Sequence, residues 1–383
     1  MIPREAENTL RQLATGYPVL AITGPRQAGK TTLARAMFDQ HPYVSMENPA
    51  EREFFDSDPR GFLDRYRDGA VVDEAQLTPN LFAWLQGVVD ESRQPGQFVL
   101  TGSQQFGLLS GITQSLAGRV AMLNLLPFTA RELADVGLLA ASLDDALITG
   151  SYPPIFDRHL DPGIWYSNYV QTYVERDVRQ LINVRDLTQF HRFLRLCAGR
   201  TGQLLNLSGL GADAGVSHNT VREWVSVLEA SFIIHRLPPY HRNFNKRLVK
   251  TPKLYFVDTG LACWLLGIAD TSQLSHHPLR GALFETWVVG EFLKRRLNAG
   301  LQSNLSFWRD RAGNEIDLLI EEAGTPLPIE IKSGVTVSRD AQRALDKWRD
   351  TTGETSHRPR IVYGGAERQR RTSLDVVPWN DIE

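Results

Sequence analysis

The chain has 383 residues, with 42 Lys or Arg against 44 Asp or Glu, so its formal net charge is −2. This balance excludes a protein that binds nucleic acid through its overall charge, and any such role must rest on a local basic patch. The two cysteines, Cys197 and Cys263, are too few and too far apart for a disulfide framework or a zinc site, which favours a reducing compartment.

No segment has the apolar length of a signal peptide or of a membrane span. We therefore expect a cytoplasmic protein that does not contact membranes. The length allows two or three domains, each with its own hydrophobic core.

The first motif follows a short helix that we expect over residues 5–14. An apolar run over residues 19–22 predicts a buried strand, and the next residues match the spacing G-x-x-x-x-G-K-T of a phosphate-binding loop. We expect Lys30 to meet the β- and γ-phosphates of ATP, and Thr31 to hold Mg²⁺ through its hydroxyl. The amides at the start of the next helix would face the phosphates, where the helix dipole favours negative charge. An ordinary glycine-containing turn is the alternative.

Two later strands end in polar side chains that would complete this site. The first leads into Asp73, expected to bind the Mg²⁺ shell, and Glu74, expected to be the base that polarises the attacking water. The second leads into Ser103 and Gln104, which would sense the γ-phosphate as such strand ends do in AAA+-type ATPases, although Ser and Gln are also ordinary loop formers. The residues expected to bind the nucleotide are Gly24, Pro25, Arg26, Gln27, Ala28, Gly29, Lys30, Thr31, Thr32, Ser103 and Gln104.

Strands near residues 19, 43, 71, 98 and 120 alternate with helices, which predicts a parallel sheet covered on both faces, an α/β fold. From residue 127 the pattern becomes helical, with a long helix expected over residues 164–181, and these helices resemble the small lid of an AAA+ module. An arginine usually neutralises charge on the transferring phosphate, in cis or from a neighbouring subunit. Arg119 and Arg176 are the candidates, and a solvated surface position is an equally good interpretation of either.

Residues 207–224 have the pattern of a helix-turn-helix, with Ser208 and Ser217 as expected N-caps and Gly215 at the turn. Residues 232–237 resemble the first strand of a wing. We therefore expect a winged helix in this part of the chain.

The basic segment, residues 236–253, contains Arg and Lys without any acidic residue and is interleaved with Tyr240 and Phe244. Such a segment suits a surface that contacts the DNA backbone. The expected DNA contacts are Ser217, His218, Asn219, Arg222, Arg242, Lys246, Arg247 and Lys250. The alternative is a winged helix that serves only as a protein spacer with a solvated basic loop.

The last third carries a second set of charged residues. An apolar-striped helix contains Glu285, a later strand contains Asp317, and alternation on the next strand puts Glu330 and Lys332 on one face. This set resembles the PD-(D/E)xK nuclease core, in which carboxylates hold Mg²⁺ and the lysine orients water or stabilises the phosphate. We expect Glu285, Asp317 and Glu330 to bind metal and to converge with Lys332 on one phosphate-facing pocket. An inactive nuclease-like module is the alternative.

Together these motifs resemble AAA-type ATPases of the AAA_14 group followed by a C-terminal domain of unknown function, and the resemblance covers nearly the whole chain. Besides the motifs above, residues 116–120 and 173–177 carry it. It implies ATP binding and hydrolysis linked to DNA, although the third strand is not followed by an obvious sensor Asn. The expected domains are a P-loop ATPase core (1–126), a helical lid (127–185), a winged helix (186–250) and a nuclease-like domain (251–383).

The expected function is a Mg²⁺-dependent ATPase whose turnover gates a DNA-binding C-terminal half, with ATP and Mg²⁺ as cofactors. DNA, branched DNA included, is the expected partner, and a homo-oligomer is left open. The rival hypothesis is a nucleotide-switched regulatory or scaffold protein whose C-terminal half binds another protein and whose nuclease-like module is inactive.

Overall fold

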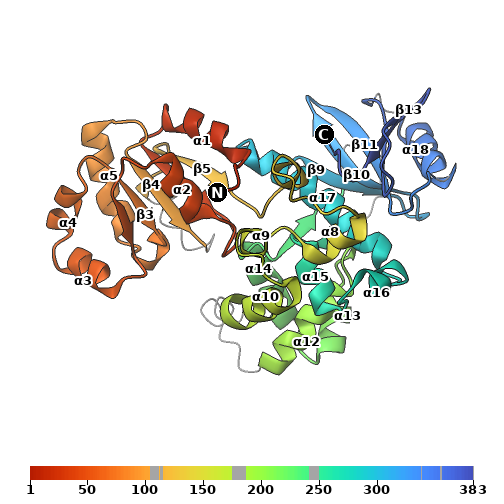
Figure 1. Ribbon diagram of the computed structural model, residues 1–383, viewed down its shortest axis with the longest axis horizontal. Coiled ribbons are helices and arrows are strands. Elements are labelled where there is room, and N and C mark those ends of the chain that lie inside the picture. The colour runs from red at the N-terminus through yellow and green to blue at the C-terminus, as the bar shows by residue number, and fades with distance from the viewer. Residues whose placement is uncertain are drawn as a thin grey trace. The chain divides into compact units, whose positions relative to one another are not determined.

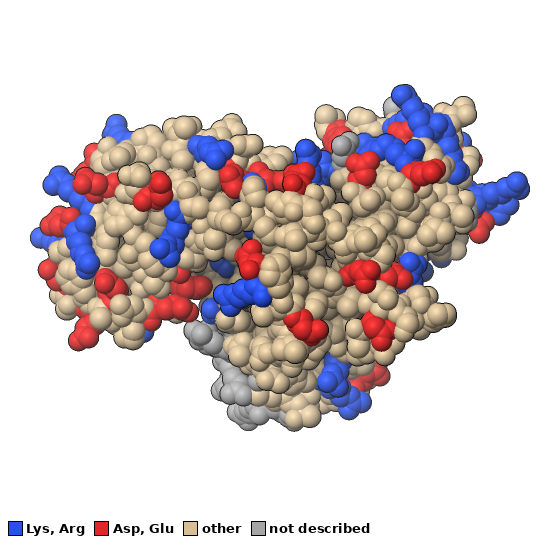
Figure 2. Space-filling view, viewed as in Figure 1, with Lys and Arg blue, Asp and Glu red and all other residues tan. Residues whose placement is uncertain are grey.

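The computed structural model describes residues 1–103, 112, 115–174, 187–240, 250–337, 339–353 and 356–382. The chain divides into two compact units (Figure 1). Unit 1 comprises Met1–Phe128, Ala230–Phe232 and Lys294–Gln302, and unit 2 comprises Thr129–Glu229, Ile233–Leu293 and Ser303–Glu383. None of the helices in the described ranges combines the length and the apolar character that crossing a bilayer requires. On the face drawn in Figure 2, basic and acidic side chains are interspersed, in keeping with the net charge of −2.

Unit 1 is built on a five-stranded sheet with the order β2-β3-β4-β1-β5, and its strand pairs are all parallel. The strands are β1 Val19–Thr23, β2 Tyr43–Ser45, β3 Ala70–Asp73, β4 Phe98–Gly102 and β5 Val120–Asn124. The connecting elements are α1 Ala6–Ala14, α2 Lys30–Met37, α3 Pro49–Ser57, α4 Pro59–Arg65, the short 3₁₀ helix η1 Ala75–Leu77 and α5 Leu81–Ser92. The α/β fold with a parallel sheet is thus confirmed.

Both faces of this sheet are buried because successive side chains of a strand point to opposite sides. On one face Ala21 and Leu100 pack with Phe62 of α4. On the other face Ile22 packs with Leu33 of α2. Because all five strands are parallel, their carboxyl ends meet at one edge, which is where α/β sheets bind ligands.

The first part of unit 2 is helical, with α7 Ala130–Ala134, α8 Leu143–Thr149, α9 Pro153–Asp157 and α10 Pro162–Tyr169. The π-helical turn η2, Val170–Val174, follows α10 directly. The long helix expected over residues 164–181 therefore changes its hydrogen-bond pattern at Val170. Residues 175–186, with Arg176, lie outside the described residues.

A buried carboxylate ties these helices to later parts of unit 2. Asp258, only 2% exposed, accepts hydrogen bonds from the Ser151 amide at 2.8 Å and the Tyr166 hydroxyl at 2.6 Å. It also caps α15, Thr259–Leu265, by accepting from the Leu261 amide. The described helices of the expected lid therefore belong to unit 2, and a lid function stays a prediction.

A helix-turn-helix order is present in α12 Leu187–Ala198, α13 Leu207–Ala214 and α14 His218–Ala230. Gly215 ends α13 with a φ of 76°, as expected for the turn residue. Ser217 accepts from the Thr220 amide at 3.1 Å, but the N-cap of α13 is Asn206 and not Ser208. The strands β6 Gln203–Leu204, β7 Ile234–Leu237 and β8 Lys253–Phe256 form an antiparallel sheet in the order β6-β8-β7.

The last part of unit 2 has a six-stranded sheet in the order β13-β14-β12-β11-β10-β9. Its elements are α16 Thr271–Ser275, α17 Arg280–Asn298, β9 Leu305–Arg309, β10 Glu315–Glu322, β11 Thr325–Lys332, α18 Arg339–Thr352, β12 Arg360–Tyr363, β13 Gln369–Arg370 and β14 Asp375–Pro378. Strands β9, β10 and β11 pair antiparallel, and β11, β12 and β14 pair parallel. The register of β9 and β10 shifts between Ile316 and Leu319, as at a β-bulge, and Asp317 lies within this interval.

Candidate functional site

The loop between β1 and α2 depends on its glycines. Gly24 has a φ of 148° and Gly29 a φ of 92°, conformations that residues with a Cβ rarely adopt. A Cβ on Gly24 would lie 2.0 Å from the Leu125 carbonyl oxygen, so a larger residue cannot stand there without moving the backbone. The loop therefore holds its shape because glycine occupies both ends.

Lys30, the first residue of α2, is buried inside this loop with 6% of its surface exposed. Its Nζ donates to the carbonyl oxygens of Gly24 at 2.9 Å and Pro25 at 2.8 Å. An ammonium group and the amides at a helix start are the donors that phosphate groups require. The donor set of the loop thus fits a polyphosphate.

Asp73, at the end of β3, accepts hydrogen bonds from hydroxyl groups on three neighbouring elements. Thr31 donates to its Oδ1 at 2.8 Å, Thr101 of β4 donates to the same oxygen, and Tyr43 of β2 donates to Oδ2 at 2.9 Å. Burial and the Asp73 carboxylate raise the pKa of Tyr43 to about 12. Carboxylate and hydroxyl oxygens are the ligands that Mg²⁺ prefers, so Thr31 and Asp73 fit this ion.

Tyr43 and Thr101 were not expected at the site from the sequence. Each lies on a strand beside β3, and only the strand order shows that their side chains reach Asp73. Thr101 could have been found from its place near the carboxyl end of β4, whereas Tyr43 begins β2 and its position gave no such signal.

Glu74 follows Asp73 in the left-handed region, with a φ of 51°. A non-glycine residue in this region is strained, and such strain is concentrated at functional sites. Its Oε2 accepts hydrogen bonds from Ser103 at 2.9 Å and from Gln76. Its Oε1 lies 3.9 Å from the guanidinium of Arg26, which is also 4.0 Å from Glu47. The expected base is thus surrounded by donors at the carboxyl edge of the sheet.

A residue near the N-terminus also holds the loop. Arg4 is 6% exposed and donates to the carbonyl oxygens of Ala28 at 2.8 Å and Leu126 at 2.6 Å. Its guanidinium stacks over the Phe128 ring. Arg4 was missed because nothing in the sequence near it indicates contact with the loop.

Arg119 lies at the other end of the sheet. Its carbonyl oxygen accepts from the Val19 amide at the start of β1, and its side chain forms an ion pair with Asp90. The five residues of β1 separate it from Gly24 by roughly 16 Å. A role of Arg119 in cis is therefore wrong, because strand order puts it at the amino edge, and a role in a neighbouring subunit stays a prediction. Gln104 lies outside the described residues.

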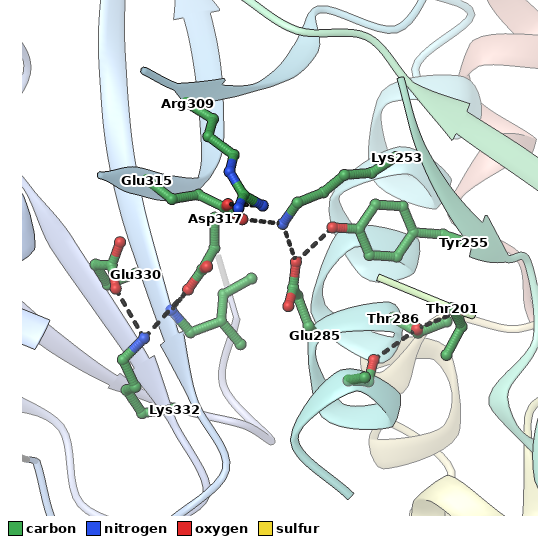
Figure 3. Close-up of polar contacts among 12 residues, drawn as sticks. Thr201, Lys253, Tyr255, Glu285, Thr286, Arg309, Glu315, Asp317, Glu330 and Lys332 are labelled. Carbon is green, nitrogen blue, oxygen red and sulfur yellow. Dashed lines mark hydrogen bonds and ion pairs between the residues drawn. The ribbon is translucent and has the colours of Figure 1, made fainter. Parts of the chain in front are cut away.

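In unit 2, three of the residues expected at the nuclease-like site meet (Figure 3). Lys332 Nζ lies 2.8 Å from Glu330 Oε2 and 3.4 Å from Asp317 Oδ2. The Ile331 amide also donates to Asp317 at 2.8 Å. Glu330 is 3% exposed, and its Oε1 has no hydrogen-bond partner among the described residues. Asp317 and Glu330 thus face the same side of the sheet.

Glu285 of α17 lies beside these residues but has different partners (Figure 3). Lys253 of β8 contacts Glu285 at 2.8 Å and also pairs with Glu315, while the Tyr255 hydroxyl donates to Glu285. Oxygens of Glu285, Glu315 and Asp317 all lie within 4.8 Å of one another, a spacing that a metal ion could bridge. The Lys253 ammonium already pairs with two of these carboxylates, Glu285 and Glu315. Nothing in the sequence indicated that Lys253 and Glu315 would meet, because their contact depends on tertiary packing between residues far apart in the chain.

The charges shift the pKa values of this acidic cluster (Glu285, Glu315, Asp317 and Glu330 with Lys253 and Lys332). Burial and the Asp317 carboxylate raise the pKa of Glu330 to about 8. Burial raises the pKa of Glu285 to about 7, although Lys253 acts against this rise. At Lys253 and Lys332 burial alone would lower the pKa, but the neighbouring carboxylates outweigh it and raise it.

The basic segment is not the continuous DNA surface that the sequence indicates. Lys253 is 2% exposed inside the acidic cluster, and Tyr240 is 5% exposed in the core of the six-stranded sheet. Arg236 pairs with Glu229. Lys253 and Tyr240 are therefore too buried to belong to the expected surface, whereas the Arg236 side chain is exposed but paired. Lys250 is exposed, whereas Arg242, Lys246, Arg247 and Phe244 lie outside the described residues.

The other expected DNA contacts, at the turn before α14 and on its first turns, are exposed to solvent. They are Ser217, His218, Asn219 and Arg222. A helix with this exposure at its start is able to present these side chains to a groove.

Comparisons with known proteins divide the chain into three matched parts. Residues 16–134 match an AAA domain, residues 140–272 match a domain of unknown function (DUF8612), and residues 280–382 match another (DUF4143). The chain is 35% identical over 349 residues to the uncharacterised proteins Mb2031c of Mycobacterium bovis and Rv2008c of Mycobacterium tuberculosis. The alignment covers 89% of this chain and 77% of each relative.

Solved structures are similar at lower levels. A Walker-type ATPase of Pyrococcus abyssi aligns with a TM-score of 0.44 and 15% identity, over 69% of this chain and 96% of that one. The Holliday junction branch migration motor RuvB of Thermotoga maritima aligns with a TM-score of 0.31 and 18% identity, over 61% of this chain and 89% of that one.

Proposed function

We propose that this chain, which belongs to the family of the two uncharacterised mycobacterial proteins, is a Mg²⁺-dependent ATPase. The observation that carries the proposal is the meeting of separate segments at the carboxyl edge of the unit 1 sheet. There Thr31 of the glycine-bounded loop bonds to Asp73 of β3 at 2.8 Å, and Glu74 follows directly. Oxygen ligands beside a phosphate-binding loop suit a Mg²⁺ ion that contacts the phosphates of ATP.

Each residue then has one task. Lys30 and the amides at the start of α2 hold the β- and γ-phosphates, and Thr31 and Asp73 hold the ion. The ion supplies positive charge to the transferring phosphoryl group. Glu74 orients the attacking water and accepts its proton, while Ser103, at 2.9 Å, fixes the direction of the Glu74 carboxylate.

Release of phosphate from ATP, with Mg²⁺ and with EDTA, tests the proposal. Glu74→Gln keeps the shape of the side chain but removes the base, so we expect turnover to fall about 100-fold or more while ATP still binds. Glu91→Gln, at an exposed position of α5, is the matched control and should leave turnover unchanged. Equal turnover of the wild type and Glu74→Gln would contradict the role of Glu74.

We also propose that turnover gates DNA binding by the C-terminal half. The exposure of Ser217, His218, Asn219 and Arg222 around the start of α14 supports this, because a recognition helix reads the groove with its first residues. The net charge of −2 means that the attraction is local and should weaken steeply as salt is added.

Binding to labelled linear, forked and four-way DNA distinguishes this from the rival scaffold hypothesis. We expect Arg222→Glu, and separately the pair Lys246→Glu and Arg247→Glu, to weaken binding at least tenfold at low salt. Arg343→Glu, whose side chain is 76% exposed on α18, is the control and should bind as the wild type does. Unchanged affinity in the test variants would favour a protein partner for this half.

One atom favours a second candidate function for unit 2, a metal-dependent action on a phosphodiester. The buried Glu330 Oε1 has no partner among the described residues, although it lies in a cluster with Asp317 and Lys332. A divalent cation bound by Glu330 and Asp317 would satisfy this oxygen. Nicking of branched DNA with Mn²⁺ that disappears in Lys332→Ala, but not in the exposed control Lys347→Ala, would establish a nuclease. Absence of cleavage with every metal would leave the inactive module.

A further inference from the structure

The guanidinium of Arg26 lies close to Glu74, the expected base of ATP hydrolysis. It belongs to the loop between Gly24 and Lys30, and its side chain is only 9% exposed. Its guanidinium lies 3.9 Å from Glu74 and 4.0 Å from Glu47, residues that follow β3 and β2. A buried arginine is therefore present at the edge of the sheet where the expected base lies.

We propose that Arg26 is the catalytic arginine of this site and that it acts in cis. The proposal rests on the ATPase function above. Glu74 positions the water that attacks the γ-phosphate, so a guanidinium about 4 Å from Glu74 lies beside the transferring group. In the chain without nucleotide Arg26 pairs with Glu74, and in the transition state it donates to the γ-phosphate oxygens.

The surroundings of Glu74 permit this change of partner. When Arg26 leaves, Ser103 and Gln76 still donate to Glu74 Oε2, and Oε1, the oxygen near Arg26, becomes free to accept a hydrogen bond from the attacking water. A second carboxylate near Arg26, that of Glu47, is 51% exposed, and an ion pair this open to solvent is weak. A transferring phosphoryl group concentrates more negative charge than either carboxylate and attracts the guanidinium.

The chemistry balances without any further reactant. The water oxygen forms a bond to the γ-phosphorus, and the bond from that phosphorus to the β,γ-bridging oxygen breaks with its electron pair staying on ADP. Glu74 takes the proton of the water and passes it to the phosphate product. Arg26 gives no proton and stabilises the negative oxygens of the transition state by hydrogen bonds.

The alternative arginines do not meet this geometry. Arg119 lies at the amino edge of the sheet, roughly 16 Å from the loop. Arg4 donates to the carbonyl oxygens of Ala28 and Leu126, so its guanidinium holds the loop between β1 and α2 in place. Unlike Arg4 and Arg119, Arg26 brings its guanidinium to 3.9 Å from Glu74.

Two variants and two readouts test the proposal. Arg26→Ala and Arg26→Gln should lower kcat about 100- to 1,000-fold, with ATP and ADP affinity changed less than about fivefold. We expect the wild type to bind ADP with aluminium fluoride and Mg²⁺, a mimic of the transition state, tightly, and both variants should lose this tight binding. Arg11→Ala, with a side chain 60% exposed on α1, is the control and should match the wild type in both readouts. Retained ADP binding also reports that the variants fold.

Mixing variants separates cis from trans action. Arg26→Ala keeps Glu74, and Glu74→Gln keeps Arg26, so a mixture regains turnover only if Arg26 acts on a neighbouring subunit. We expect no regain, and recovery of turnover would overturn the cis assignment. If the wild type does not hydrolyse ATP, the proposed function itself fails. If it does, and Arg26→Ala turns over at the wild-type rate or faster, only the inference about Arg26 fails.

Discussion

Lys30 of unit 1 and Lys253 of unit 2 are both buried but differ in the groups to which they donate. Lys30 in unit 1 is 6% exposed and donates to the backbone carbonyls of Gly24 and Pro25. Lys253 in unit 2 is 2% exposed and contacts the carboxylates of Glu285 and Glu315. The Lys30 ammonium therefore contacts carbonyl groups without net charge, and the Lys253 ammonium contacts charged carboxylates.

The difference teaches which buried cation is available to a ligand. A phosphate can replace or join the carbonyl partners of Lys30 because a carbonyl carries no net charge that would be left alone. Removing Lys253 would leave the Glu285 carboxylate close to those of Glu315 and Asp317 without the shared ammonium, although Glu315 keeps Arg309, and this is strongly unfavourable. We infer that Lys30 serves binding and Lys253 serves the stability of unit 2.

The largest effect that we predict is the loss of Lys253. Lys253→Met should lower the free energy of unfolding of unit 2 by about 3 to 5 kcal/mol, because breaking a buried pair leaves uncompensated charge. Lys30→Met should lower the stability of unit 1 by about 1 to 2 kcal/mol, because it loses two hydrogen bonds to carbonyls that carry no net charge. Denaturant unfolding followed by circular dichroism measures the stability loss of each variant. Tryptophan fluorescence reports mainly on unit 2, because all tryptophans except Trp84 belong to that unit.

The exposed Lys347→Met is the control for Lys253→Met and should be neutral. The double variant Lys253→Met with Glu285→Gln should recover part of the loss, because it also removes one unpaired carboxylate. Equal losses in the Lys30 and Lys253 variants would end the distinction between the two lysines.

The second prediction concerns pH and the acidic cluster. Burial raises the pKa of Glu330 from 4.5 to about 8, so between these values the native state keeps a proton that the unfolded state has lost. Raising the pH through this window therefore lowers the free energy of unfolding, by roughly 1 to 3 kcal/mol. Unfolding of the wild type and Glu330→Gln from pH 5 to pH 8 measures the slope, which the variant should flatten. Glu321→Gln, exposed on β10, should keep the wild-type slope, and a stability that rises over this window would contradict the assignment.

A smaller effect should follow from Glu315. Its carboxylate is shared between Lys253 and Arg309, and its side chain is 21% exposed, so water compensates part of any loss. Glu315→Gln should lower the stability of unit 2 by about 1 to 2 kcal/mol, less than Lys253→Met does. A loss as large as that of Lys253→Met would show that Glu315, and not Glu285, is the main partner of the lysine.

The smallest effect should come from Arg119. Its ion pair with Asp90 is exposed, and surface pairs of this kind contribute little. We expect Arg119→Ala to leave the unfolding midpoint unchanged and ATP turnover within about twofold of the wild type. A large loss of turnover with unchanged nucleotide affinity would instead assign Arg119 to a neighbouring subunit's site.

The sequence predicts best where the chemistry is contiguous. The loop from Gly24 to Thr31 is one local motif, and the period of two along β11 is enough to put Glu330 and Lys332 on the same face. A motif of this kind needs no knowledge of the fold, so its residues could be named in advance.

Residues that depend on packing could not be predicted in this way. Arg119 follows a suggestive motif, but the strand order puts it at the amino edge of the sheet. Lys253 reads as part of a basic surface, although β8 carries it into the acidic cluster. Tyr240 reads as a base-stacking ring but is buried in a core. In each case the sequence shows the chemical type of the side chain, but its neighbours depend on the fold.

Calorimetric titration of the wild type, Lys30→Met and Lys253→Met with a non-hydrolysable ATP analogue and Mg²⁺ tests the account most directly. We predict that Lys30→Met loses binding by at least 100-fold, because the lysine that meets the phosphates is gone. Lys253→Met, studied at a temperature where it stays folded, should bind the analogue as the wild type does. Wild-type affinity in Lys30→Met would contradict the assignment of the loop between β1 and α2 as the nucleotide site.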